Sequence, residues 1–138
     1  MNFPVTENIA KSQRHTSFYL ACDMSEATPI IFLHGWPELS ISWRHQLPTF
    51  ASLGFRPIAP DMRGYGRSSV YSRHEDYALE QVVADMIELL DAISAERAVW
   101  GRSRLGFASG LVDRSASSPA LLWCSKSLRA LYSGWLRS

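Results

Sequence analysis

Apolar and polar positions follow clear periods up to about residue 100, and these periods predict alternating strands and helices. Ser17 to Cys22 is expected to form an edge strand. The continuous apolar run from Pro29 to Leu33 is typical of a strand that is buried on both faces of a parallel sheet. Arg56 to Pro60, whose prolines limit its length, and Ala98 to Trp100 are expected to add further strands.

Two helices are expected between these strands. The first is capped by Ser40 or Ser42 and ended by Gly54, and its apolar side consists of Trp43, Leu47, Phe50 and Leu53. The second has apolar residues at spacings of three and four, namely Leu79, Val82, Val83, Met86, Leu90 and Ile93. Its acidic residues are expected on the opposite side: Glu80, Asp85, Glu88 and Asp91. This alternation predicts an α/β fold with a parallel sheet, right-handed crossovers and helices on both faces.

The composition is that of a soluble globular protein, with 46% hydrophobic and 20% charged residues. A net charge of +1 gives no field that would attract nucleic acid or an anionic membrane, and it fits a small neutral substrate better. Glu7 and Asn8 interrupt the segment where a secretory signal would be apolar, and no stretch approaches the roughly 18 to 20 apolar residues of a membrane helix. A cytoplasmic protein is therefore expected. Cys22 and Cys124 lack a Cys-x-x-Cys partner or a nearby His cluster, which predicts two free thiols, no metal site and no disulfide framework. No cofactor is expected.

The segment His34-Gly35-Trp36-Pro37 follows the buried strand directly, at the carboxyl end where open α/β sheets bind their ligands. A sharp turn beside a nucleophile points a backbone N–H at an oxygen that becomes negative during attack. The segment itself is expected to lie at a ligand-binding edge of the sheet. A second loop, from Asp61 to Ser69, follows the next strand and reads Asp-Met-Arg-Gly-Tyr-Gly-Arg-Ser-Ser.

Over residues 29–100 the chain resembles the epoxide hydrolases of the α/β-hydrolase superfamily. The resemblance rests on the His-Gly-x-Pro motif at His34 to Pro37, on the segment Trp43 to Pro48, and on the Asp-x-Arg-Gly-x-Gly-x-Ser segment that begins at Asp61. Related dehalogenases usually have asparagine at the position of Trp36, where it holds a halide. Trp36 therefore favours an epoxide hydrolase, and a dehalogenase-type hydrolase is the alternative.

The resemblance implies a role for several residues. In the family the turn that corresponds to His34 to Pro37 forms one side of the oxyanion hole, and the residue after the motif's glycine, here Trp36, donates its N–H to the oxyanion. The implied reaction acts on a small neutral epoxide: an aspartate opens the ring to an ester, and a histidine-activated water releases the diol. Tyrosines of a cap domain would donate to the epoxide oxygen. His34 is interpreted as a structural histidine bonded to backbone, Asp61 and Arg63 as a loop-bracing pair, and Gly64 and Gly66 as residues needed for positive φ.

The family pattern breaks after Trp100. The family continues with Gly-His-Asp-x-Gly, the turn that presents the nucleophilic aspartate, whereas this chain reads Gly101-Arg102-Ser103-Arg104-Leu105-Gly106. With permitted codons, a one-base change of frame at Gly101 gives Val-Gly-His-Asp-Trp-Gly-Ser-Pro-Val, and later His-His-Pro and Val-Ala-Ser-Leu-Cys-Val-Pro-Tyr. Residues 1–100 are therefore interpreted as the N-terminal part of an α/β-hydrolase domain. Residues 101–138 are interpreted as an out-of-frame translation that arises from a lesion, an unrecognised intron or a sequencing error.

The chain itself is expected to be truncated before the cap domain and the later strands, and to be inactive. Gly101-Arg102-Ser103 is similar to the start of a serine elbow, but Leu105 stands where the elbow requires its second glycine. No histidine follows His74 to act as the base of such a triad. A non-catalytic remnant, acting as an interaction module through an open sheet edge, is a further alternative.

Overall fold

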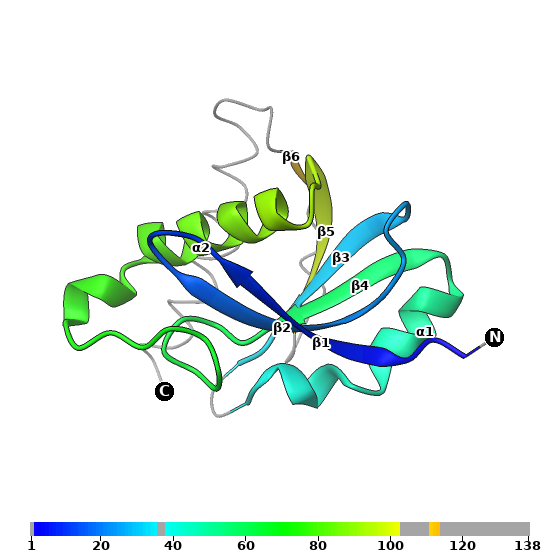
Figure 1. Ribbon diagram of the computed structural model, residues 1–138, viewed down its shortest axis with the longest axis horizontal. Coiled ribbons are helices and arrows are strands. Elements are labelled where there is room, and N and C mark those ends of the chain that lie inside the picture. Colours follow the sequence, from blue (N-terminus) through cyan, green and yellow to red (C-terminus); the bar gives the residue numbers. More distant parts are fainter. Residues whose placement is uncertain (1, 36–37, 103–110, 114–138) are drawn as a thin grey trace.

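A computed structural model describes residues 2–35, 38–102 and 111–113, which form one mixed sheet flanked by helices (Figure 1). The strands lie in the order β1-β2-β4-β3-β5-β6. Their bounds are β1 Val5–Lys11, β2 Thr16–Cys22, β3 Thr28–Leu33, β4 Phe55–Pro60, β5 Arg97–Arg102 and β6 Leu111–Asp113. β3 runs parallel to β4 on one side and to β5 on the other, whereas β1, β2 and β6 run antiparallel to their neighbours. The predicted parallel core is confirmed for these three central strands.

β2 is an interior strand, so the prediction of an edge strand for residues 17–22 is wrong. β1 pairs with it from Val5↔Cys22 to Lys11↔Thr16 and forms the outer edge. The sequence gives little sign of β1 because this strand is only partly buried. Ile9, for example, is 63% exposed, so the apolar alternation that marks a half-buried strand is weak.

β3 has a continuous apolar sequence because both of its faces are buried. Ile31 and Leu33 belong to a cluster with the apolar side of α2 (Leu79–Ala92). Ile30 and Phe32 point the other way, into a second cluster with Leu47 and Ala51 of α1 (Gln46–Ser52). Side chains that alternate between two helical layers are what a central parallel strand requires.

The single helix expected from Ser40 is in fact two pieces. Residues Ser40–Trp43 form a short 3-10 helix, η1, and α1 begins only at Gln46. Pro48 gives the physical reason: it has no N–H, which a helix interior would need but a first turn leaves unpaired. Leu53 lies beyond the end of α1 and is 65% exposed, so its assignment to the apolar side is wrong. Gly54, with φ +87°, turns the chain into β4 as expected.

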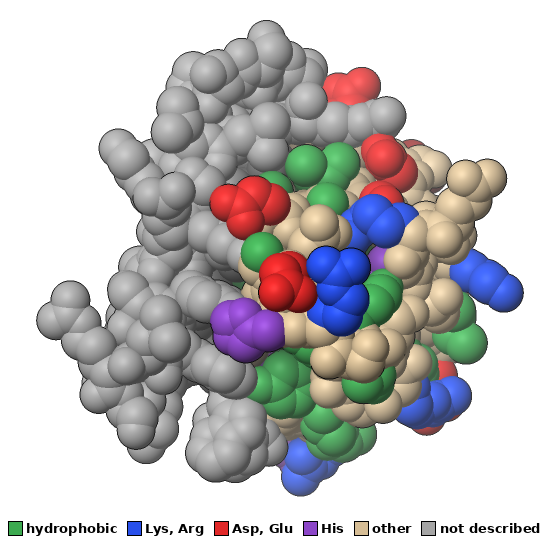
Figure 2. Space-filling model, turned by 90° about the vertical axis from the view of Figure 1, so that its left-hand side faces the viewer, with side chains coloured by type: hydrophobic (Ala, Val, Ile, Leu, Met, Phe, Trp, Pro, Cys, Tyr) green, Lys and Arg blue, Asp and Glu red, His purple; other side chains and the backbone are tan. Residues whose placement is uncertain are grey.

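A second 3-10 helix, η2 (His74–Tyr77), leads into α2, which begins where the apolar spacing placed it. In the described part of the chain, no helix combines the length and the apolar character needed to cross a bilayer. On the face shown in Figure 2, acidic and basic side chains of the described residues lie beside one another and form no patch of a single sign.

Candidate active site at the carboxyl ends of the central strands

The two sequence motifs lie at the same edge of the sheet. His34 and Gly35 follow β3 directly, and Asp61 follows β4, which is parallel to β3. On the other side, the register Leu33↔Arg102 brings the end of β5 beside the end of β3. Carboxyl ends of parallel strands are where α/β folds bind ligands. Trp36, Pro37 and the segment 103–106 lie outside the described residues.

His34 connects the loop that follows β3 to the loop that follows β4, residues 61–69, which is here named the β4 loop. Its side chain is buried, and its Nε2 accepts the backbone N–H of Met62 at 2.9 Å. Its Nδ1 lies 3.0 Å from the carbonyl oxygen of Gly35, which requires the Nδ1–H tautomer because Nε2 acts as an acceptor. The ring also meets Tyr65 edge-on, with the ring centroids 5.0 Å apart. His34 is thus bonded to backbone at both nitrogens, as expected.

Asp61 joins three segments of backbone. Its Oδ1 accepts the N–H of Ser40 at 2.8 Å, and its Oδ2 accepts the N–H of Arg67 at 3.1 Å. Its own N–H donates to the carbonyl of Phe18 in β2. The hydroxyl of Ser68 donates to its carbonyl oxygen at 2.6 Å and accepts the N–H of Phe18 at 2.9 Å. Asp61 therefore fixes the β4 loop against both β2 and η1.

Gly64 and Gly66 both have positive φ, at +83° and +50°, as the sequence predicts. Gly66 has a second constraint because it passes close to Asp61. A Cβ at this position would lie 2.7 Å from the carboxyl carbon of Asp61, so any side chain would push the carboxylate away from its two N–H donors. At Gly64 a Cβ would instead meet the ring of Tyr77. Both glycines are therefore required by conformation and by space.

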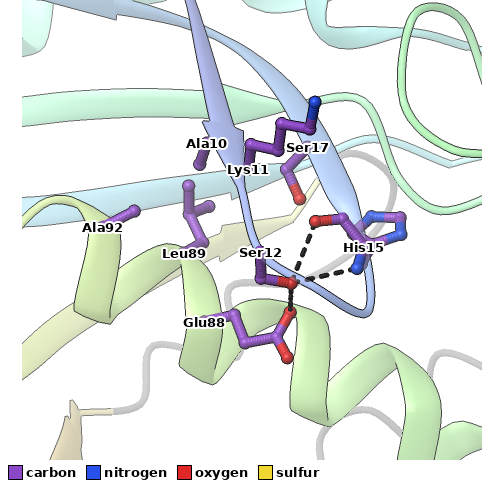
Figure 3. A pocket seen from close by; sticks show the side chains of 8 residues that line it. All are labelled: Ala10, Lys11, Ser12, His15, Ser17, Glu88, Leu89 and Ala92. Atoms are coloured by element: carbon purple, nitrogen blue, oxygen red, sulfur yellow. Dashed lines mark hydrogen bonds between the residues drawn. The ribbon is translucent and has the colours of Figure 1, made fainter.

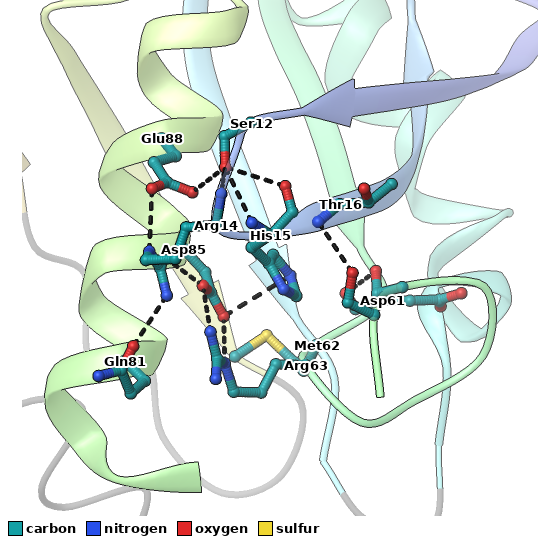
Figure 4. A network of polar contacts seen from close by, with 12 residues as sticks. Ser12, Arg14, His15, Thr16, Asp61, Met62, Arg63, Gln81, Asp85 and Glu88 are labelled. Carbon is teal, nitrogen blue, oxygen red and sulfur yellow. Dashed lines mark hydrogen bonds and ion pairs between the residues drawn. The ribbon is translucent and has the colours of Figure 1, made fainter. Parts of the chain in front are cut away.

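Arg63 does not pair with Asp61; it belongs to a second network around Asp85 (Figure 4). Its Nε and Nη2 donate to the two carboxylate oxygens of Asp85, at 2.7 and 2.9 Å. It also donates to the carbonyl of Asp76, and its guanidinium lies 4.3 Å from the centre of the Tyr71 ring. The interpretation of Asp61 and Arg63 as one pair is wrong: each braces the loop through different partners.

Asp85 is 1% exposed, so its assignment to the polar side of α2 is wrong. Besides Arg63 it receives Nη2 of Arg14 at 2.5 Å, from the turn between β1 and β2. Arg14 continues to Glu88 at 2.9 Å and to Gln81 at 2.9 Å. The hydrogen bonds to Asp85 raise the pKa of Arg63, so that this guanidinium stays charged although it is buried. The network holds the β4 loop and the β1–β2 turn on α2 (Figure 4).

His15 lies between this network and the sheet, beside Asp85 and Tyr71. It is buried, its Nδ1 lies 2.9 Å from the hydroxyl of Tyr71, and its Nε2 lies 3.6 Å from Asp85, beyond hydrogen-bond range. Neither His15 nor Asp85 was singled out as a functional residue from the sequence. The signal for Asp85 was its spacing, three residues after Val82 and four before Leu89, which places it inside the apolar stripe.

A small pocket opens beside this network, between β1, β2 and the second half of α2 (Figure 3). It is lined by Ala10, Lys11, Ser12, His15, Ser17, Glu88, Leu89 and Ala92. Within the pocket the hydroxyl of Ser12 is already hydrogen-bonded: its Oγ donates to Glu88 Oε2 at 2.8 Å and accepts the N–H of His15 at 2.9 Å. None of the lining residues comes from the loops after β3 or β4. The described residues also contain no group of three or more His, Cys, Asp or Glu side chains placed to hold a metal ion.

The buried histidines make stability depend on pH. Burial lowers the pKa of His34 below its ordinary 6.5, and burial also lowers that of His15, although Asp85 opposes the shift. Below pH 6.5 the unfolded chain therefore binds more protons than the folded chain. We expect the free energy of unfolding to fall as the pH is lowered from 7.5 to 5.5, and to fall less in His34→Asn. Urea titrations across this range measure it, and a pH-independent value would contradict the expectation.

The comparisons with known proteins agree with this architecture. A family model described as the alpha/beta hydrolase fold matches residues 28–104, more than half of the chain. The chain therefore belongs to the α/β-hydrolase fold family. This confirms the predicted fold class.

Among curated proteins, the chain is similar to epoxide hydrolases. It is 50% identical over 74 residues to Epoxide hydrolase A of Mycobacterium tuberculosis, which covers 54% of this chain and 23% of that protein. It is 42% identical over 76 residues to Epoxide hydrolase 1 of Siraitia grosvenorii, covering 52% and 24%. The chain spans about a quarter of the length of these relatives.

A solved structure gives the same likeness in three dimensions. The crystal structure of Epoxide Hydrolase A from Mycobacterium thermoresistibile matches with a TM-score of 0.68 and 33% identity, over 72% of this chain and 31% of that one. An epoxide hydrolase of Vigna radiata matches with a TM-score of 0.66 and 28% identity, over 71% and 31%. The likeness to epoxide hydrolases stated from the motifs is therefore confirmed.

Proposed function

We propose that the chain derives from an epoxide hydrolase whose intact, in-frame form hydrolyses a small neutral epoxide to a diol. The observation that carries the proposal is the turn at His34-Gly35, which follows β3 beside the end of β5. A nucleophile presented directly after β5 would lie next to this turn. The epoxide hydrolases among the relatives support this choice of substrate over others that the fold serves.

In the proposed reaction an aspartate after β5 attacks an epoxide carbon and forms an ester, while the opened oxygen takes a proton from cap tyrosines. A water activated by histidine then adds to the ester carbonyl. The N–H of Trp36, together with the N–H that follows the nucleophile, stabilises the resulting oxyanion. Collapse of this intermediate releases the diol and regenerates the carboxylate. This chain has Arg104 where the aspartate is expected, so we propose that it has no turnover in its present frame.

We further propose that residues 101–138 are read out of frame. After a one-base shift, permitted codons for Gly101 to Gly110 encode Val-Gly-His-Asp-Trp-Gly-Ser-Pro-Val, which places an aspartate at the position of Arg104. In the shifted frame, only the wobble bases of the present codons are free to vary. Agreement over successive positions is therefore informative. The end of the family match at residue 104 also supports a change near this point.

Sequencing of the genomic DNA and the messenger RNA around the codons for Trp100 to Arg104 tests the frame directly. We expect that one base is gained or lost relative to the present frame, or that the message is spliced so that the aspartate turn is encoded. Coding DNA whose shifted frame did not encode Gly-His-Asp would refute the proposal. In that case the chain would be a remnant of the family with a tail of its own.

A further inference from the structure

We infer that Asp61 is a positioning residue for the oxyanion turn, here the segment from His34 to Ser40, and that it acts through the N–H of Ser40. This inference rests on the proposed function. The two ends of the turn are tied to consecutive residues of the β4 loop: His34 accepts the N–H of Met62, and the N–H of Ser40 donates to Asp61. The proposed oxyanion donor, Trp36, lies between these two ties in the sequence.

The turn also has internal hydrogen bonds between Gly35 and Glu38. The N–H of Glu38 donates to the carbonyl of Gly35 at 2.9 Å, and the N–H of Gly35 faces Glu38 Oε2 at 3.4 Å. These contacts are local, so they shape the turn without fixing it to the sheet. The ties to Met62 and Asp61 provide that fixation, because the β4 loop is itself bonded to β2 through Asp61 and Ser68.

Asp61 suits this task because its surroundings define its position closely. It is 3% exposed, and each carboxylate oxygen accepts a backbone N–H: Ser40 on one side and Arg67 on the other. No ion pair of the described residues involves Asp61, so backbone donors rather than a mobile cation hold the charge. A carboxylate held in this way places the start of η1 at a defined distance from the sheet.

The catalytic consequence follows from the sensitivity of oxyanion holes to geometry. A displacement of about 1 Å in a catalytic group costs on the order of a hundredfold in rate. Loss of the hydrogen bond at Ser40 would leave that end of the turn placed less closely, because it would be held mainly by the packing of Trp43 in η1 against Phe32 of β3. The rate of the chemical step would then fall, whereas the binding of substrate would change little. Asp61 would thus affect kcat more than KM.

The hydrogen bond from the N–H of Ser40 to Asp61 can be removed with a matched control at the same position. Ser40→Pro deletes the N–H donor, and proline is tolerated here because Ser40 is the first residue of η1 and Leu39 before it is extended, with φ −137° and ψ 174°. Ser40→Ala removes the hydroxyl but keeps the N–H. Asp61→Asn, which keeps the shape but replaces one acceptor with a donor, serves as a second variant that is independent of proline.

The first measurement is amide hydrogen exchange on the 138-residue chain. In Ser40→Pro and Asp61→Asn we expect the amides of Gly35 and Glu38 to exchange at least about tenfold faster than in Ser40→Ala, with the β3 amide of Ile31 unchanged as a check of folding. Equal exchange at Gly35 and Glu38 in all three variants would overturn the inference. If proline unfolds β3, Asp61→Asn decides the result.

The second measurement is epoxide hydrolysis by the frame-restored protein. There we expect Ser40→Pro to lower kcat by about tenfold to a hundredfold relative to Ser40→Ala, with KM within about twofold of the value in that control. An unchanged kcat in Ser40→Pro would overturn the catalytic part of the inference. If the frame-restored parent itself is inactive, the proposed function fails, while the exchange rates still decide whether Asp61 holds the turn.

Discussion

Replacing Asp85 by leucine is expected to lower the free energy of unfolding by about 3–5 kcal/mol. Asp85 is 1% exposed and neutralises Arg63, which is 4% exposed and would remain buried without its partner. Leucine has a similar size and fits the apolar stripe of α2. The loss of stability therefore comes from the buried guanidinium of Arg63, which loses its carboxylate partner, rather than from a cavity. Urea unfolding followed by circular dichroism measures the difference from the parent chain.

Two controls separate this explanation from general sensitivity of the fold. Adding Arg63→Met to Asp85→Leu removes the stranded charge, so the double variant is expected to recover most of the lost stability. Glu75→Gln breaks the pair of Arg73 and Glu75, whose side chains are 71% and 73% exposed, and is expected to change stability by less than about 0.5 kcal/mol. A double variant as unstable as Asp85→Leu alone would contradict the role assigned to Arg63.

The central strands were predictable because burial on both faces leaves a simple signature. β3 is apolar at every position from Pro29 to Leu33, and α2 repeats its apolar residues at three and four. Such patterns report on how a segment faces the core and need no knowledge of its partners. β1 gave no comparable signature, because an edge strand with Ile9 exposed has too little burial to impose one.

The network around Asp85 could not be predicted from the sequence, and the position of Asp85 shows why. Its spacing from Val82 and Leu89 placed it in the apolar stripe, but a charged residue was assigned to the polar side. A buried carboxylate is tolerated only with cationic partners, and these come from positions 22 and 71 residues earlier in the chain. No local period contains that information. It appears only when the β1–β2 turn, the β4 loop and α2 are brought together.

The candidate site was predictable to the extent that it depends on backbone conformation. The positive φ of Gly64 and Gly66 and the backbone bonds of His34 follow from residue type and motif order. The partners of Asp61 did not follow, because they are backbone N–H groups of Ser40 and Arg67, and every residue except proline carries such a group. Sequence therefore indicated that Asp61 and Arg63 brace the β4 loop but not how they do so.

Restoring the reading frame is expected to give a protein with epoxide hydrolase activity, whereas the 138-residue chain is expected to show no turnover. The frame-restored protein should convert an epoxide to a diol, and replacing the aspartate that it encodes in place of Arg104 with asparagine should lower kcat by about 10⁴-fold or more, because that carboxylate forms the covalent intermediate. Diol formation by the two proteins and by the 138-residue chain measures these differences under the same conditions.

A single turnover in heavy-oxygen water tests the nucleophile itself. If the aspartate attacks carbon and water attacks the ester carbonyl, the label enters the protein carboxylate and the diol receives the unlabelled carboxylate oxygen. Label found only in the diol would mean that water attacks the epoxide directly, which would leave the N–H of Trp36 without an ester oxyanion to stabilise. Halide release from a haloalkane without diol formation would instead favour a dehalogenase, and would show that Trp36 does not exclude that chemistry.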